Sequence, residues 1–176
     1  MLSVISLMSV SCKNDKKDAV PGEKKAPLKE NFYVEISAQT AKKDDFAVYF
    51  TEDGTNNFNG VKTVWHGVNA GENQSVVFDL PVTAIPTNIR LDFGLNKDQD
   101  SVVVSKIKFA FLDKTHEIKG SQFFDFFIKD EQFKTEIDSA KGTLKIVKSG
   151  SEFKTPYFYP RQELIDKIKE MTKGNK

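Results

Sequence analysis

Aromatic side chains on the solvent-facing sides of predicted strands are the first candidates for chemistry in this sequence. Trp65 is the only tryptophan and directly precedes His66. Tyr33 and Tyr49 fall on positions that alternate with the predicted core residues of their strands. Aromatic rings can stack on the apolar face of a sugar, with a few polar groups fixing its orientation. The candidate ligand-binding residues are therefore Tyr33, Tyr49, Trp65 and His66. For Trp65, the alternation along residues 61–65 favours the other interpretation, in which the ring packs in the core.

Oxygen-bearing side chains alternate in the loop expected after residue 94, at Asn96, Asp98 and Asp100. Oxygen ligands at this spacing suit Ca²⁺. A complete EF-hand loop is excluded, because its glycine is missing and its twelfth position is Ile107. The polar composition of the loop favours the alternative of a solvated hairpin turn. A structural Ca²⁺ is the one cofactor that the sequence suggests.

The motifs of the common enzyme classes are missing from the sequence. His66 and His116 are the only histidines, whereas a zinc site needs several His, Cys or carboxylate ligands at matched spacing. No nucleophile elbow, phosphate-binding loop or dinucleotide fingerprint occurs. Paired carboxylates for glycoside hydrolysis are harder to exclude, since they can come from distant strands, and Glu35, Asp79 and Asp92 all have outward parity. We expect a protein that is not an enzyme.

The charge balance argues against a nucleic-acid partner. Lys and Arg total 26 and Asp and Glu total 25, so the net charge is +1. Proteins that bind nucleic acid need a basic excess on one face. Fifteen phenylalanines predict a core built from large aromatic side chains. Cys12 is the only cysteine, so the fold cannot depend on an internal disulfide.

Alternation with period two predicts strands along most of the chain after residue 31. The strands are expected near residues 32–38, 46–51, 61–66, 76–80, 89–93, 101–112 and 144–146. No helix long enough for a parallel crossover lies between them. The predicted fold class is all-β: an antiparallel β-sandwich or jelly roll with a short C-terminal helix.

Two segments depart from the alternation. Residues 121–128 hold four phenylalanines in five positions, which predicts a short helical turn that plugs one end of the sandwich. Residues 161–172 follow a proline and carry apolar side chains at helical spacing. We expect this segment to be a helix that packs its apolar stripe on a sheet.

Two neighbouring strand segments resemble the paired strands of galactose-binding-like jelly rolls. The first, residues 88–94, reads Asn-Ile-Arg-Leu-Asp-Phe-Gly, and the second, residues 102–109, reads Val-Val-Val-Ser-Lys-Ile-Lys-Phe. Many carbohydrate-binding modules have this fold. The resemblance therefore implies a jelly roll over about residues 32–159 and a carbohydrate ligand. It assigns no binding residue, because sugar sites in this family lie on variable loops.

The first twelve residues resemble the leader of a bacterial lipoprotein. Residues 1–11 form an apolar run too short to span a bilayer, and the run ends at Cys12 as a lipobox does. The absence of Lys and Arg before Cys12 departs from the signal-peptide pattern, and an incidental apolar N-terminus is the alternative. Lysines, prolines and a glycine make residues 12–30 a flexible tether that begins at the lipidated cysteine. Residues 31–176 form the β-sandwich domain.

Together these features predict a lipid-anchored protein of the bacterial cell envelope with a non-catalytic β-sandwich binding module for carbohydrate. Charged residues directly after Cys12 resemble export signals of some Gram-negative lipoproteins, so we expect the outer membrane and favour a surface-exposed domain, with a domain that faces the periplasm as the alternative. The alternative is a structural or protein-interaction lipoprotein of the envelope. The expected partners are the membrane, through the anchor, and either a glycan or an envelope protein.

Overall fold

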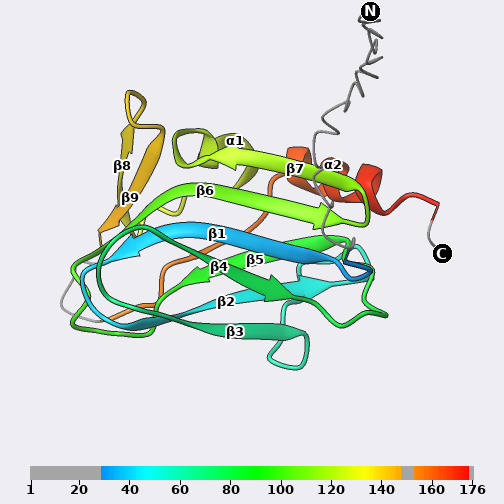
Figure 1. The fold of residues 1–176 in the computed structure, drawn as a ribbon, viewed down its shortest axis with the longest axis horizontal. Helices are drawn as coiled ribbons and strands as arrows, with labels where there is room; N and C mark the ends of the chain where they lie inside the picture. The colour runs from blue at the N-terminus through cyan, green and yellow to red at the C-terminus, as the bar shows by residue number, and fades with distance from the viewer. Residues whose placement is uncertain (1–28, 148–152, 175–176) are drawn as a thin grey trace, which may run out of the picture.

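The computed structural model describes residues 29–147 and 153–174, in which ten strands form two antiparallel sheets packed as a sandwich (Figure 1). The six-stranded sheet has the order β4 (Gln74–Asp79), β1 (Tyr33–Thr40), β6 (Ser101–Phe111), β9 (Thr143–Val147) and β8 (Lys134–Asp138), and β7 (Lys114–Lys119) also pairs with β6. The four-stranded sheet has the order β10 (Tyr157–Phe158), β5 (Asn88–Phe93), β2 (Asp44–Thr51) and β3 (Thr63–Val68). The prediction of an all-β sandwich is confirmed.

Phenylalanine dominates the space between the sheets, as the composition predicts. The phenylalanines that are fully buried are Phe32, Phe46, Phe78, Phe93, Phe109, Phe123, Phe127 and Phe158. Several of their rings meet edge to face, while Phe123 and Phe127 stack with ring centroids 4.6 Å apart. The ring centroids of Phe123 and Phe158, for example, lie 4.9 Å apart at an interplanar angle of 86°. Such contacts add to the free energy gained by burying the apolar area of each ring.

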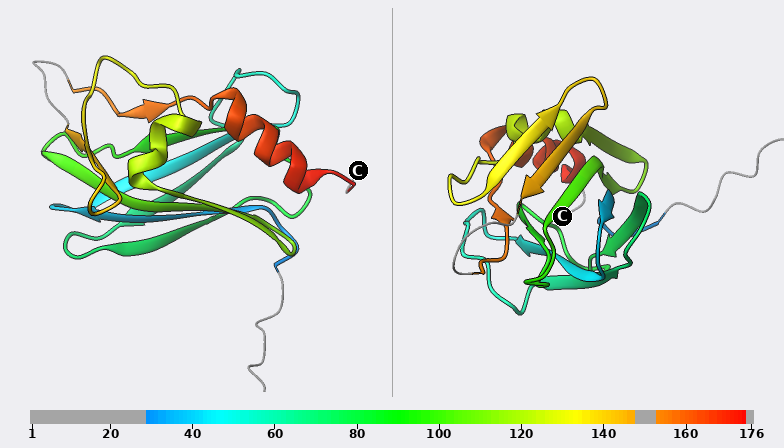
Figure 2. Two further views of the ribbon diagram at one scale, coloured as in Figure 1. Left: turned by 90° about the horizontal axis from the view of Figure 1, so that it is seen from above. Right: turned by 90° about the vertical axis from the view of Figure 1, so that its left-hand side faces the viewer.

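The two helical segments expected from the sequence are present. The phenylalanine-rich segment forms a 3-10 turn, η1 (Gly120–Gln122), followed by the single-turn helix α1 (Phe123–Phe126). The C-terminal helix α2 (Gln162–Thr172) buries Leu164, Ile168 and Met171 and contacts strands of both sheets. Figure 2 shows α1 and α2 on the same side of the sandwich, where they contact each other.

Strand β6 changes its partner along one edge, and this opens a fork in the six-stranded sheet. β9 pairs with β6 over Ser101–Val104, and β7 pairs with it over Lys106–Phe111. The chain leaves β7 through Gly120, which lies in the fork. A Cβ on Gly120 would lie 2.6 Å from the backbone nitrogen of Leu144 and would also collide with the carbonyl oxygen of Val104. Only glycine lets the chain pass so close to β6 and β9.

The expected signal peptide, Cys12 and nearly all of the tether lie outside the described residues. The described chain begins at Lys29, whose ammonium group contacts Asp79 on β4 at 2.7 Å. No helix in the described part of the chain is long and apolar enough to cross a membrane.

Candidate functional site

The two outer faces of the sandwich differ in chemistry. On the six-stranded sheet, exposed lysines alternate with glutamates and form ion pairs such as Lys106 with Glu117 and Lys145 with Glu136. Ion pairs as exposed as these contribute little to stability. They mark a solvated surface. On the four-stranded sheet, aromatic side chains occupy the outward positions, and this face is the stronger candidate for a binding site.

The strand register brings the outward side chains of the four-stranded sheet into two rows. Tyr49 on β2 lies opposite Thr63 on β3 and Arg90 on β5. Ala47, two residues away, lies opposite Trp65 and Asp92. Side chains two residues apart on a strand share a face. The tryptophan therefore lies beside the tyrosine, with ring centroids 6.2 Å apart.

Trp65 is 44% exposed, which contradicts the core position favoured by the alternation along residues 61–65. Strand β3 begins only at Thr63, and Val61, which lies before it, is 90% exposed. Val64, on the other parity, packs against the hydrophobic core. The turn before β3 thus shifts the phase of the pattern. Trp65 therefore lies on the outer face of the four-stranded sheet, exposed to solvent.

Arg90 lies at the centre of an aromatic cluster beside Trp65. Its guanidinium carbon lies 4.0 Å from the ring centroid of Tyr49. Three further rings lie within 6 Å of that carbon: Tyr157 at 5.2 Å, Phe58 at 5.7 Å and Tyr159 at 5.8 Å. The sequence has only two arginines among its 26 basic residues. A planar guanidinium can stack on several rings at once, which the ammonium group of a lysine cannot do.

The guanidinium of Arg90 also forms a forked ion pair with Asp92. Its Nε donates to Oδ1 at 2.8 Å, and its second terminal nitrogen donates to Oδ2 at 2.9 Å. Burial opposes the charge on Arg90, but Asp92 and the Tyr159 hydroxyl outweigh it and hold the pKa of Arg90 above its usual value. Burial raises the pKa of Asp92, and Arg90 opposes that shift. The pair neutralises itself and fixes the surrounding rings, so it offers no net charge to a ligand.

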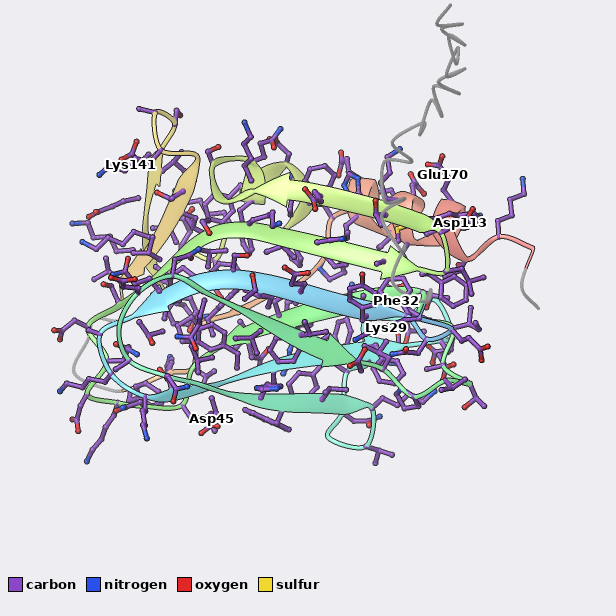
Figure 3. The ribbon with its side chains drawn as sticks, viewed as in Figure 1. Lys29, Phe32, Asp45, Asp113, Lys141 and Glu170 are labelled. Atoms are coloured by element: carbon purple, nitrogen blue, oxygen red, sulfur yellow. The ribbon has the colours of Figure 1, made fainter. Side chains whose placement is uncertain are left out.

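A depression of about 540 Å³ lies at the end of this face. Its lining includes Lys43, Asp45, Gly67, Asn69 and Leu95. Gly67 lies two residues from Trp65 on the same face of β3 and opposite Asp45 on β2. Gly67 has no side chain, and a Cβ built on it would meet only the Asp45 carboxylate, at 3.6 Å. Figure 3 labels Asp45 at the margin of the four-stranded sheet.

The loop predicted to hold Ca²⁺ borders the same depression through Asn96. The Oδ1 atom of Asn96 accepts the backbone N–H of Asp98 at 2.9 Å, and its Nδ2 donates to the carbonyl of Lys43. Gln99, rather than Asp98 or Asp100, turns inward and accepts the backbone N–H groups of residues 41 and 42. Side-chain hydrogen bonds thus brace the loop.

Asp44 braces the same loop from β2. One of its carboxylate oxygens accepts the backbone N–H groups of Leu95 and Asn96 at 2.6 and 2.8 Å. Among the described residues, no group of three or more His, Cys, Asp or Glu side chains could hold a metal ion. The Ca²⁺ site at Asn96, Asp98 and Asp100 stays a prediction.

Tyr33 and His66 lie away from Trp65 and Tyr49. Tyr33 is on the outer face of the other sheet, where the Lys29 ammonium lies 4.9 Å from its ring centroid. His66 faces away from Trp65 and stacks edge to face on Phe78 at 5.9 Å. The structure therefore brings together two of the four predicted aromatic residues.

The carboxylates considered for glycoside hydrolysis are also separated. Asp92 is held by Arg90, and Asp79 by Lys29 and Asn31. Glu35 lies on the outer face of the six-stranded sheet with Asp79, opposite the sheet that carries Asp92. These three residues do not form a common site.

Sequence reasoning missed the polar half of the candidate site. Asp45 and Asn69 lie at strand ends and Gly67 lies within β3, so no local pattern distinguishes them from turn residues. For Arg90, the sequence feature that could have indicated a special role is that the chain has only two arginines. No protein-family model, curated protein or solved structure matches this chain. The assignment of function therefore rests on the geometry of the face itself.

Proposed function

We propose that the protein is a lipid-anchored lipoprotein of the bacterial cell envelope whose β-sandwich binds carbohydrate without catalysis. One observation supports the proposal: the exposed Trp65 lies two residues from Gly67, on the same face of β3, and Gly67 lines a depression with a carboxylate, an amide and an ammonium group. A sugar ring has an apolar face for the indole and hydroxyl groups for hydrogen bonds. Trp65 could meet the apolar face, and the polar side chains that line the depression could meet the hydroxyl groups.

The geometry suggests how a sugar would lie. Its apolar face stacks on Trp65, whose own position is fixed by the edge-to-face contact with Tyr49. Its hydroxyl groups extend over Gly67 towards Asp45 and Asn69. A carboxylate accepts hydrogen bonds from hydroxyl groups, and an amide both donates and accepts. Arg90 supports the rings and takes no part in contact with the ligand.

The test is a glycan-array screen of the domain, residues 28–176, with and without Ca²⁺. We expect binding that falls at least tenfold, or about 1.4 kcal/mol, in Trp65→Ala. Gly67→Val should abolish binding, because its methyl groups would project into the depression. Valine suits a strand, and a Cβ at Gly67 meets only the Asp45 carboxylate, at 3.6 Å, so this variant should keep its stability.

Tyr33→Ala is the matched control, since it removes an aromatic ring from the opposite outer face and should leave binding unchanged. Loss of signal on removal of Ca²⁺ would support the ion site in the loop. If the domain binds no glycan on the array, the carbohydrate proposal is wrong. The search would then turn to an envelope partner for a structural or protein-interaction lipoprotein.

The anchor is tested at Cys12. The full chain, expressed in a Gram-negative host, should incorporate labelled palmitate and sediment with the membranes. Cys12→Ser removes the thiol that the lipid would modify, so we expect loss of the label and release of most of the protein from the membrane fraction. The Trp65→Ala chain should retain the label. Unlabelled wild-type protein would contradict the lipoprotein proposal while leaving the glycan site untouched.

A further inference from the structure

The fork in the six-stranded sheet contains a second depression, of about 520 Å³. It lies between β7 and the β8–β9 hairpin, where β6 exchanges one partner for the other. The side chains that matter to its chemistry are Lys106, Glu117, Lys119, Gln122, Ser139 and Lys141. Lys141 is at the tip of the hairpin, on the side of the molecule away from Asp45 (Figure 3). This fork groove is separate from the aromatic face.

Two lysines in the fork groove are placed against each other by the strand register. Lys106 on β6 and Lys119 on β7 are direct cross-strand partners. Like charges in this relation destabilise a sheet. Lys106 is compensated by Glu117 at 3.7 Å, and Lys141 at the hairpin by Asp138 at 3.6 Å. Among the described residues, Lys119 pairs with no carboxylate.

The side chain of Lys119 is exposed, and its stem runs close to the hairpin. Its Cδ lies 3.5 Å from the position that a Cβ on Gly142 would take, so its stem crosses the fork against the backbone of the hairpin. The backbone N–H of Lys119 donates to Oε1 of Gln122 at 3.2 Å. This bond turns the amide oxygen of Gln122 towards the backbone of Lys119, and the amide NH2 group is a further donor among the side chains that line the groove. Ser139 contributes a hydroxyl group.

The groove therefore presents mainly donors around one uncompensated positive charge. We propose that the fork groove binds a tetrahedral oxyanion, the phosphate or sulfate group of an ester, with Lys119 as its principal contact. Such a group accepts hydrogen bonds on several oxygens, and ammonium groups are common partners of phosphate. Its charge would also relieve the repulsion between Lys106 and Lys119.

The test is a titration of the ¹⁵N-labelled protein followed by NMR at constant pH and ionic strength. Inorganic phosphate, inorganic sulfate, glucose 6-phosphate and unmodified glucose are compared, with chloride as the ionic-strength control. We expect saturable amide shifts at residues 105, 119 and 139–142 with phosphate or sulfate, and none with chloride or glucose. A larger response to the sugar ester than to the inorganic ions would identify an ester-bearing saccharide as the source.

Lys119→Met keeps the aliphatic stem across the fork and removes only the charge. We expect it to weaken the binding of the oxyanion at least fivefold. Lys108→Met is the matched control, because Lys108 lies on the same outer face between Glu35 and Glu117 but outside the groove. It should bind as the wild type does. Shifts that persist in Lys119→Met, or that follow chloride equally, would overturn the proposal. Neither result depends on the glycan site.

Discussion

Replacing Arg90 with alanine is expected to destabilise the domain by about 3 kcal/mol, one of the two largest effects that we expect from a single substitution. The change leaves the Asp92 carboxylate, in a residue that is 5% exposed, without its forked partner. It also removes the cation on which the rings of Tyr49 and Tyr157 stack. The value lies at the lower end for a broken buried pair, because the Arg90 side chain keeps 16% of its exposure. Urea unfolding followed by circular dichroism would measure it.

Two further variants separate the buried charge from the packing. Arg90→Lys should recover only part of the lost stability, because an ammonium group cannot make both parallel hydrogen bonds to Asp92 or lie flat against an aromatic ring. The double variant Arg90→Met with Asp92→Leu removes both charges and keeps much of the volume. We expect it to be more stable than Arg90→Ala, since no uncompensated charge stays behind. If Arg90→Ala loses less than about 1 kcal/mol, the ion pair does not hold this face together.

The position of Trp65 in the candidate site depends indirectly on Arg90. The guanidinium of Arg90 packs on the ring of Tyr49, and Tyr49 in turn packs against Trp65. Of these three side chains, Trp65 is the one exposed enough to meet a ligand. Rigid aromatic rings lose little conformational entropy when they bind. Because the ion pair beneath these rings neutralises itself, we expect the proposed site to prefer an uncharged ligand, such as a neutral sugar, to a charged one.

The fold class could be predicted because its evidence is local. Alternation placed Val34 and Ile36 in the core on β1, and helical spacing placed Leu164 and Ile168 on the buried face of α2. Each pattern lies within one element and needs no knowledge of its neighbours. The concentration of phenylalanine similarly predicted an aromatic core without predicting which rings would meet.

The candidate site could be predicted only in part, because it depends on pairing between strands. Trp65 was assigned the wrong side since the alternation was followed through Val61, which precedes the strand. The proximity of Gly67 to Asp45 follows from the register of β2 and β3, which are joined by the long loop 52–62. No spacing in the sequence sets that register. Tyr157 reaches Arg90 from a strand far along the chain, for the same reason.

Gly120→Ala is expected to destabilise the domain by about 3 kcal/mol or more, or to prevent the accumulation of soluble protein. A methyl group at this position would collide with the carbonyl of Val104 and lie 2.6 Å from the backbone nitrogen of Leu144. Both atoms belong to the strands β6 and β9. Because these are backbone atoms of paired strands, they cannot move aside as the end of a side chain could. The fork would have to widen, at the expense of the β6–β9 ladder.

Gly60→Ala is the matched control for this prediction. A Cβ on Gly60 would meet nothing within 4 Å, and its backbone does not need a positive φ. We expect its free energy of unfolding to stay within about 0.5 kcal/mol of the wild type. Thermal and urea unfolding of both variants, with soluble yield as a second readout, would decide the matter. A stable Gly120→Ala protein would mean that β7 and β9 can separate at little cost. The fork groove, whose width is set by the same close approach, would then be a loose surface that could not keep the stem of Lys119 close to the hairpin.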